Sequence, residues 1–336
     1  MDEHIADALS RPDLVRLTDR VFCVRFETMK VVSALAAVRR LLDEGRVRPG
    51  DTVLDSSSGI YAYALALACH RFGLRCYIVG STTVDETLRV QLEVLGATLE
   101  RMPPSGSLEL DQNRRVRRVR EILWRNPEYH WMRQYHDDIH YLGYRTVAED
   151  LVRELGVDEV TVVGGVGSGA STGALAVYLR QRSVDVRLVG VQPFGSVTFG
   201  SEHVADPEII IAGIGSSIRF DNVVHGLYDT IHWTAFEAAL SGSVELLRRH
   251  AVFAGLSSGA AYLVANWESA VDRDRAVLFI AADTGHRYTE SVFARHEQAR
   301  DLDSLAPREV LTREELSRPW SRMAWNRRGP GPELSG

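Results

Sequence analysis

The sequence has few cysteines, one lysine and no long apolar run. Its three cysteines, Cys23, Cys69 and Cys76, form no Cys-x-x-Cys pair, which excludes a disulfide framework and a four-thiolate zinc site. No stretch reaches the roughly eighteen apolar residues of a membrane span, and the N-terminal segment is polar and acidic rather than signal-like. We therefore expect a cytoplasmic protein with reduced, mostly buried thiols and no membrane partner.

Composition and charge narrow the class further. The 336 residues are 45% hydrophobic and 25% charged, which suits a globular chain long enough for two packed domains. The net charge of -6 argues against nucleic acid as a partner. Arginines crowd between Arg114 and Arg120, and we interpret this run as the solvated face of a helix rather than an anion site.

Lys30 is the only lysine among the 39 basic residues. An arginine can neither deprotonate in a protein nor condense with an aldehyde, whereas a lysine amine can do both. Lys30 is therefore a candidate for covalent chemistry. Chance survival of one surface lysine remains the alternative on composition alone.

Short apolar runs alternate with helical segments from Lys30 onward, which is typical of parallel βαβ units. We predict helices at 30–42, 61–72, 85–95, 140–155 and 235–250. We predict another helix that follows the glycine-rich stretch and ends near Arg182, and one from Ser258. We predict strands at 52–54, 76–79, 159–163, 186–191 and 276–281. The pattern indicates two α/β layers with a cleft between them.

The glycine-rich stretch from Gly164 to Gly173 follows a strand and opens a helix, so its backbone N–H groups and helix dipole suit a phosphate. A dinucleotide fold would need an acidic residue after the next strand, where this chain has Gln192. The stretch also lacks the lysine of a nucleoside-triphosphate loop. A tight structural turn stays open as the alternative.

Three further loops carry hydroxyls at points where strands meet helices. The serine-rich loop from Asp55 to Ile60 would suit a carboxylate, and the loop from Gly255 to Ala261 has the same character. The loop from Ala282 to Tyr288 presents a hydroxyl at Thr284, at the carboxyl end of a strand, where α/β sites gather.

Together, Lys30 and these loops resemble the fold-type II pyridoxal-phosphate enzymes, most closely cysteine synthase, cystathionine β-synthase and diaminopropionate synthase. The resemblance covers about Phe26 to Tyr288. It implies a Schiff base between Lys30 and pyridoxal 5'-phosphate. It implies cofactor contacts from Gly167, Ser168, Gly169, Ala170, Ser171 and Thr284. It implies substrate contacts from Ser57, Ser58, Gly59, Ile60 and Gln134.

The implied fold is α/β and two-domain, like the tryptophan synthase β-subunit, with parallel sheets, flanking helices and the cofactor in the interdomain cleft. Its parts are an N-terminal arm and strand at 1–29, a smaller α/β domain at 30–139 with the lysine and the carboxylate loop, a larger one at 140–300 with the phosphate cup, and a C-terminal tail at 301–336.

The implied activity is β-replacement on O-acetylserine, O-phosphoserine or serine through an α-aminoacrylate, with a nucleophilic co-substrate and a homodimeric enzyme. One alternative is β-elimination by a lyase or dehydratase. From another class, a non-catalytic nucleotide- or ligand-binding α/β module is the alternative.

Two features set the chain apart from the family it resembles. Ile60 stands where the family has the asparagine that bonds the cofactor's phenolic oxygen, and the segment before Lys30 lacks the usual Asn-Pro and Gly-Ser residues. Both suggest a specialised biosynthetic member. We expect Asp283 to point away from the ring and Thr284 to face it. His136 and His140 lie four residues apart, but the sequence places no third ligand near them, so we expect no metal.

Overall fold

The computed structural model describes residues 1–81, 84–103, 108–208 and 213–325. The chain folds into two compact units. The first unit holds Met1–Arg11 and Thr28–Gly143, and the second holds Pro12–Glu27 and the chain from Tyr144 onward. No helix within the described ranges combines the length and apolar character that a bilayer crossing requires.

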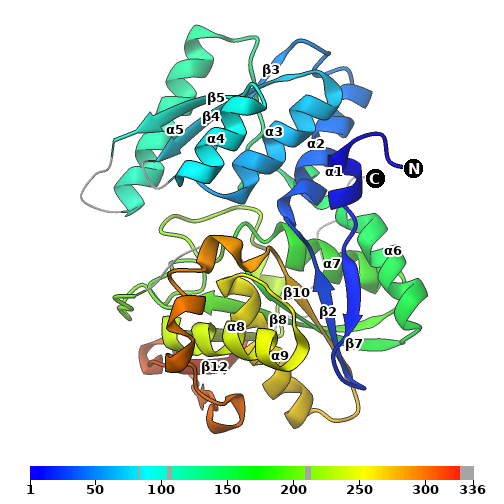
Figure 1. Cartoon of the computed structure of the whole chain (residues 1–336), viewed down its shortest axis with the longest axis vertical. Coiled ribbons are helices and arrows are strands. Elements are labelled where there is room, and N and C mark those ends of the chain that lie inside the picture. Colours follow the sequence, from blue (N-terminus) through cyan, green and yellow to red (C-terminus); the bar gives the residue numbers. More distant parts are fainter. Residues whose placement is uncertain (82–83, 104–107, 209–212, 326–336) are drawn as a thin grey trace. The chain divides into compact units, whose positions relative to one another are not determined.

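A four-stranded parallel sheet forms the centre of the first unit (Figure 1). Its strands, in spatial order, are β5 (Thr98–Met102), β4 (Arg75–Ser81), β3 (Thr52–Ser56) and β6 (His130–Trp131). The helices are α1 (Ile5–Leu9), α2 (Lys30–Asp43), α3 (Ile60–Phe72), α4 (Glu86–Val94), α5 (Leu108–Arg125) and the 3-10 turn η1 (Asp138–Tyr141).

Helices cover both faces of this sheet because side chains alternate along its strands. Leu54 and Val79 pack against α5, whereas their neighbours Val53 and Ile78 belong to the core formed with α2 and α3. Because both faces of these strands are buried, their sequences are continuous apolar runs, and such runs allow the strands to be predicted.

An eight-stranded sheet forms the centre of the second unit. Its strands, in spatial order, are β1 (Asp13–Arg16), β2 (Val21–Arg25), β10 (Ala276–Ala281), β7 (Glu159–Gly165), β8 (Asp185–Pro193), β9 (Thr230–Thr234), β12 (Trp320–Ala324) and β11 (Arg308–Glu309). The α-helices are α6 (Tyr144–Leu155), α7 (Ala170–Gln181), α8 (Phe236–His250) and α9 (Leu256–Val271). The 3-10 turns are η2 (His225–Leu227), η3 (Gly285–Tyr288), η4 (Phe293–Gln298), η5 (Leu302–Ser304) and η6 (Arg313–Glu315).

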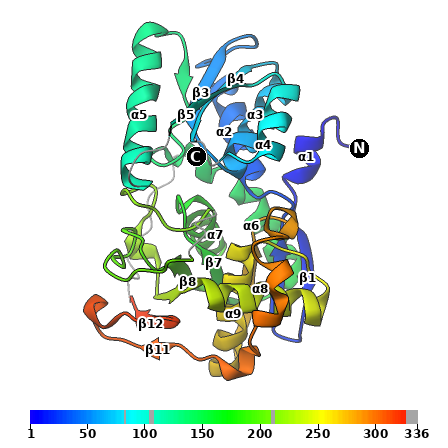
Figure 2. The same cartoon turned by 60° about the vertical axis from the view of Figure 1, so that its left-hand side comes forward.

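Both ends of the chain add strands to this second sheet (Figures 1 and 2). β2 pairs in parallel with β10, and β12 runs antiparallel to β9. The sequence analysis gave 1–29 as an N-terminal arm and strand and 301–336 as a tail, and in the structure these two regions contribute β1, β2, β11 and β12 to this sheet. These strands are short, and the partners that join β2 and β12 to the rest of the sheet, β10 and β9, are distant in the sequence.

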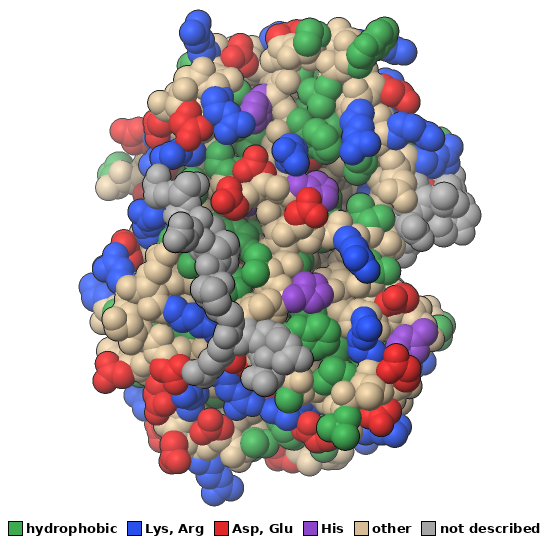
Figure 3. Space-filling model, turned by 180° about the vertical axis from the view of Figure 1, so that it is seen from behind, with side chains coloured by type: hydrophobic (Ala, Val, Ile, Leu, Met, Phe, Trp, Pro, Cys, Tyr) green, Lys and Arg blue, Asp and Glu red, His purple; other side chains and the backbone are tan. Residues whose placement is uncertain are grey.

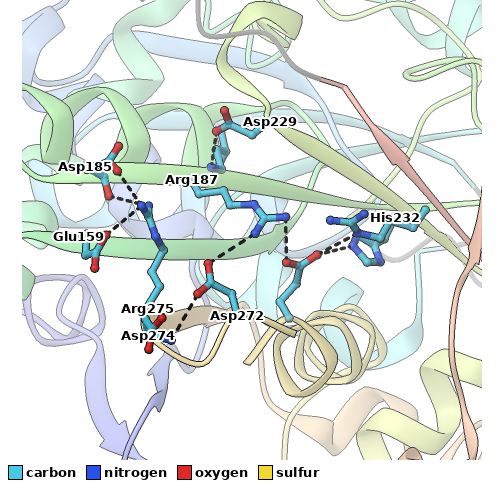
Figure 4. Close-up of polar contacts among 11 residues, drawn as sticks. Glu159, Asp185, Arg187, Asp229, His232, Asp272, Asp274 and Arg275 are labelled. Atoms are coloured by element: carbon cyan, nitrogen blue, oxygen red, sulfur yellow. Dashed lines mark hydrogen bonds and ion pairs between the residues drawn. The ribbon is translucent and has the colours of Figure 1, made fainter. Parts of the chain in front are cut away.

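A buried polar network joins β8, β9, α9 and β12 (Figure 4). The imidazole of His232 accepts a hydrogen bond at Nδ1 from Trp320 Nε1 (3.0 Å), so Nε2 carries the proton that bonds Glu268 Oε1 (3.0 Å). Arg187 and Arg322 each lie 3.2 Å from the Glu268 carboxylate. This network attaches the last strand to the body of the second unit.

All three cysteines are buried and unpaired, as the composition predicts. On the face drawn in Figure 3, the described arginine and acidic side chains are interspersed.

Candidate active site

The serine loop (Ser57–Gly59) joins β3 to α3 in the first unit. Gly59 is the N-cap of α3 in extended conformation (φ -132°, ψ -155°), with no side chain capping the helix. The hydroxyl of Ser57 accepts from the Gly59 N–H at 3.4 Å. Ile60 is the first residue of α3 and offers no polar side-chain atom. The loop therefore combines hydroxyls with a helix N-terminus, an arrangement that binds carboxylates.

Ser58 is oriented by donors from two other elements. Its Oγ accepts from the Ser81 N–H (2.8 Å) at the end of β4 and from Arg115 Nη1 (3.1 Å) on α5. The Ser81 hydroxyl also lies 2.9 Å from this oxygen, so three contacts from β4 and α5 fix the position of Ser58.

Arg115 differs from the other arginines of its run. Its Nε is buried and finds no hydrogen-bond partner among the described residues, and burial lowers the pKa of its guanidinium. The sequence interpretation of a solvated helix face is therefore wrong at this residue, although Arg117 and Arg120 are exposed. The reason is spacing: Arg115 precedes Val119 and Ile122, the buried positions of α5, by one and two helical turns.

Gln134 is held beside the serine loop by two contacts. Its Nε2 donates to the carbonyl of Ser56 (2.8 Å), and its backbone N–H donates to the buried carboxylate of Asp55 (3.0 Å). Asp55 also accepts from Trp131 Nε1 at 3.0 Å. Burial raises the pKa of Asp55 to about 6 in spite of these donors. Sequence reasoning missed this anchor, whose signal was an acid inside an apolar strand.

Lys30 is the first residue of α2, directly after its N-cap Met29. Burial lowers the pKa of its ammonium to about 8, so the neutral amine is accessible near neutral pH. Two buried hydroxyls of the same unit, Thr28 Oγ1 and Tyr61 Oη, have no hydrogen-bond partner in the described part of the chain. Such orphaned atoms are typical of a site that a polar ligand completes.

Of the histidine pair that the sequence considered as metal ligands, His140 lies in the turn η1. His140 is buried, and its Nε2 donates to the carbonyl of Met132 at 2.9 Å. Burial lowers its pKa to about 4, and the charge of Lys30 adds to this shift. Within the described ranges, no three metal-ligating side chains gather.

The glycine-rich cup lies between β7 and α7 in the second unit. Gly169 is the N-cap of α7 at φ +79°, again without a side-chain cap. A Cβ on Gly169 would lie 2.6 Å from the Asn222 carbonyl oxygen, and one on Gly167 would lie 2.2 Å from that of Gly213. The absence of side chains at these glycines therefore lets two other backbone segments pack closely against the cup. Its other predicted members, Ser168, Ala170 and Ser171, are buried there.

Two more loops meet at the carboxyl ends of the same strands. A Cβ on Gly165 would lie 3.8 Å from that of Ser257. Ser258 accepts a hydrogen bond from the Ala282 N–H at 3.0 Å. These contacts bring the cup, the start of α9 and the loop after β10 into one region of the second unit.

Thr284 and Asp283 face different neighbours in the last loop. Thr284 Oγ1 lies 3.0 Å from Nδ1 of His286. Asp283 packs against Gly255, where a Cβ would meet its Oδ1 at 2.2 Å, and it accepts from Tyr288. Burial raises the pKa of Asp283 to about 7, and its Oδ1 has no partner among the described residues.

A family model described as pyridoxal-phosphate dependent enzyme matches residues 24–283, most of the chain and all of these loops but the end of the last. The chain belongs to this family. Pyridoxal 5'-phosphate is its cofactor, and the residues fit it: a glycine cup, open helix N-termini and a lysine of lowered pKa.

The chain is similar to curated members of the family. It is 32% identical to the N-(2-amino-2-carboxyethyl)-L-glutamate synthase of Ralstonia nicotianae over 263 residues, which cover 76% of this chain and 75% of that protein. It is 27% identical to a cysteine synthase of Helicobacter pylori over 249 residues, 73% of this chain and 78% of that one.

Solved structures show the same fold. A cysteine synthase from Entamoeba histolytica aligns with TM-score 0.79 at 20% identity, covering 90% of this chain and 95% of that one. An O-ureido-L-serine synthase aligns with TM-score 0.75 at 21% identity, covering 86% and 94%. The predicted fold class, two-domain α/β of fold type II, is thereby confirmed.

Proposed function

We propose that this enzyme carries out β-replacement on a serine-derived amino acid and that the incoming nucleophile is the amine of an acidic amino acid. O-acetylserine, O-phosphoserine and serine are the candidate donors. The bound cofactor supplies an electron sink that lets an α-carbon lose its proton. The other parts of the reaction fall to residues of the chain.

Lys30 is proposed to hold the cofactor and then to move the α-proton through Nζ. It is the only side-chain primary amine in the sequence. A pKa of about 8 leaves a usable fraction of neutral amine at neutral pH, which a general base requires.

The remaining roles follow from the loops. Gly167–Ser171 are proposed to bind the phosphate, and Thr284 to face the pyridine nitrogen. The serine loop, Ile60 and Gln134 are proposed to enclose the substrate's α-carboxylate at the N-terminus of α3, where Gln134 is anchored to Ser56.

Arg115 is the observation that carries the choice of an acidic partner. Burial lowers the pKa of the Arg115 guanidinium although the charge of Asp111 opposes this, and its Nε has no partner among the described residues, so an additional anion would stabilise it. Its Nη1 contacts the serine loop, so that anion would lie beside the substrate. The name of the Ralstonia relative specifies a glutamate amine in its product, which agrees with an acidic nucleophile.

The test is product analysis with matched nucleophiles. The holoenzyme is mixed with each donor and with L-glutamate, L-glutamine or sulfide, and products and pyruvate are quantified by mass spectrometry. We expect an N-linked three-carbon product, formed about tenfold or more faster with glutamate than with glutamine, because one charge-assisted hydrogen bond is worth about 1.5–3 kcal/mol.

Arg115→Gln should abolish this preference, while Arg117→Gln, an exposed position on the same helix, should retain it. If Arg115→Gln instead raises only the KM of O-phosphoserine, the anion is the donor's phosphate and the nucleophile proposal is wrong. Pyruvate as the main product with every nucleophile would favour β-elimination.

We also propose that the enzyme is cytoplasmic and that it is a homodimer. Three buried, unpaired thiols suit a reducing compartment. Cell fractionation and light scattering of the purified holoenzyme would test them, and a periplasmic or monomeric protein would contradict them.

A further inference from the structure

The turn that carries Thr284 is held firmly within the second unit. Thr284 forms an isolated β-bridge with Ala254, and the Gly285 N–H donates to the carbonyl of Phe253 at 3.2 Å. A Cβ on Gly285 would lie 2.5 Å from the Phe253 ring. The backbone on both sides of the Thr284 hydroxyl is therefore fixed.

His286 follows in the same turn, where its exposed side chain packs against Phe253. Its ring meets the Phe253 ring edge-on, at 5.1 Å between centroids and 82° between planes. Phe253 in turn packs against Phe293 at 4.6 Å. This packing holds Nδ1 of His286 3.0 Å from Thr284 Oγ1.

The hydrogen bond between these two atoms has two directions with opposite consequences. If the hydroxyl donates to Nδ1, its single hydrogen is used within the turn. If Nδ1–H donates to Oγ1, the hydroxyl hydrogen remains available for a further acceptor. Hydrogen bonds in such a chain polarise one another, so the second direction also makes the hydroxyl a stronger donor.

We infer that His286 is a positioning residue for the cofactor ring: its Nδ1–H donates to Thr284 Oγ1 and directs the hydroxyl hydrogen to the pyridine nitrogen. This inference rests on the proposed function, which places Thr284 opposite that nitrogen. His286 acts through Thr284 and sets how strongly the ring nitrogen is hydrogen-bonded.

The experiment measures the ring nitrogen itself. Each protein is loaded with pyridoxal phosphate labelled with ¹⁵N in the ring, and the ¹⁵N resonance is recorded without substrate. His286→Phe keeps an aromatic ring against Phe253 and removes the N–H. His286→Asn places an amide N–H close to the position of Nδ1. Thr284→Val removes the hydroxyl at constant shape.

We expect Thr284→Val to move the resonance to the position of a nitrogen without a hydrogen bond. His286→Phe should move it in the same direction by a smaller amount, and His286→Asn should restore it. In the Thr284→Val background, His286→Phe should add nothing, because the two side chains act in series.

The two proposals fail in different ways. If Thr284→Val shifts the resonance and His286→Phe does not, the positioning role is wrong while the placement of Thr284 stands. If Thr284→Val leaves the resonance unchanged in a holoenzyme that retains its cofactor, the placement of Thr284 is wrong. Should His286→Phe fail to fold, His286→Ala is interpreted by the same criteria.

Discussion

Lys30 occupies an environment that disfavours its own charge. Burial lowers the pKa of its ammonium to about 8 from an ordinary value of 10.5. Below pH 8 the folded chain carries this charge at a penalty that the unfolded chain does not bear. The penalty disappears as the pH rises from 8 towards 10.5, where the folded amine has already lost its proton.

We therefore predict that Lys30→Met stabilises the cofactor-free protein at pH 7 by on the order of 2 kcal/mol, because a pKa shift of one unit corresponds to about 1.4 kcal/mol. The gain should shrink at pH 10. Urea unfolding of both proteins at the two pH values measures it, with Arg120→Met at an exposed position as the control. An equal free energy of unfolding for Lys30→Met and the parent at pH 7 would contradict the account.

Some residues of the site could be predicted from the sequence, and others could not. Lys30 and the loop glycines stand out because their chemistry is local to a few consecutive residues. Asp55 and Arg115 do not, since each acts with a partner that only folding brings to it, Gln134 and Ser58. His286 lies two residues from Thr284, but the Phe253 ring that packs against it comes from another part of the chain.

At the scale of elements, the conformation of the cup requires glycine at Gly169. Gly169 has φ +79°, and its missing Cβ leaves room for the Asn222 carbonyl. Gly45 has φ +68°, but a Cβ at that position would have nothing within 4 Å. A substitution at either glycine is strained by the positive φ, but only at Gly169 does the added Cβ also clash with another part of the chain.

We predict that Gly169→Ala lowers the affinity for the cofactor by about tenfold or more, whereas Gly45→Ala leaves it unchanged. Only the first substitution introduces a clash that displaces the backbone of the cup, and overpacking of this kind costs about 1–3 kcal/mol. Both should lose stability from the positive φ. Fluorescence titration with pyridoxal phosphate gives the affinities. Equal affinities in the two variants would place the phosphate elsewhere.

Helices and strands that are specified by neighbouring residues could be predicted from the sequence, whereas those that depend on contacts between distant residues could not. The helix predicted at 61–72 is confirmed as α3 with Gly73 at its end in the left-handed conformation, because glycine there is a local signal. The helix predicted at 140–155 begins as the turn η1 and becomes α-helical only at Tyr144. β12 carries no local signal, because it is defined by pairing with β9.

At the scale of the molecule, a buried network of charged side chains stabilises the second unit in addition to its hydrophobic core. Although burial opposes it, His232 and two arginines hold the pKa of Glu268 at about 2, and burial lowers the pKa of His232. Both folded groups bind protons less readily than the unfolded ones. Stability is therefore lost as the pH falls, first below the ordinary range of histidine and then from 4.5 towards 2.

We predict that Glu268→Gln lowers the free energy of unfolding at pH 7 by about 3 kcal/mol, because it leaves two arginines without their buried carboxylate. It should also flatten the loss of stability between pH 5 and pH 3. Glu309→Gln removes an exposed partner of Arg322 and should change stability by less than about 1 kcal/mol. Equal effects of the two substitutions, measured by urea unfolding, would show that the network does not fasten β12.

The central claim is that one lysine in the whole chain carries the cofactor. The direct measurement is the mass of the intact holoprotein after borohydride reduction, followed by peptide mapping. Because Lys30 is the only lysine, we predict one added cofactor per chain, on the peptide containing Lys30, and none on Lys30→Arg. Cofactor on the N-terminal amine alone, or an unmodified chain that still turns over, would contradict the account.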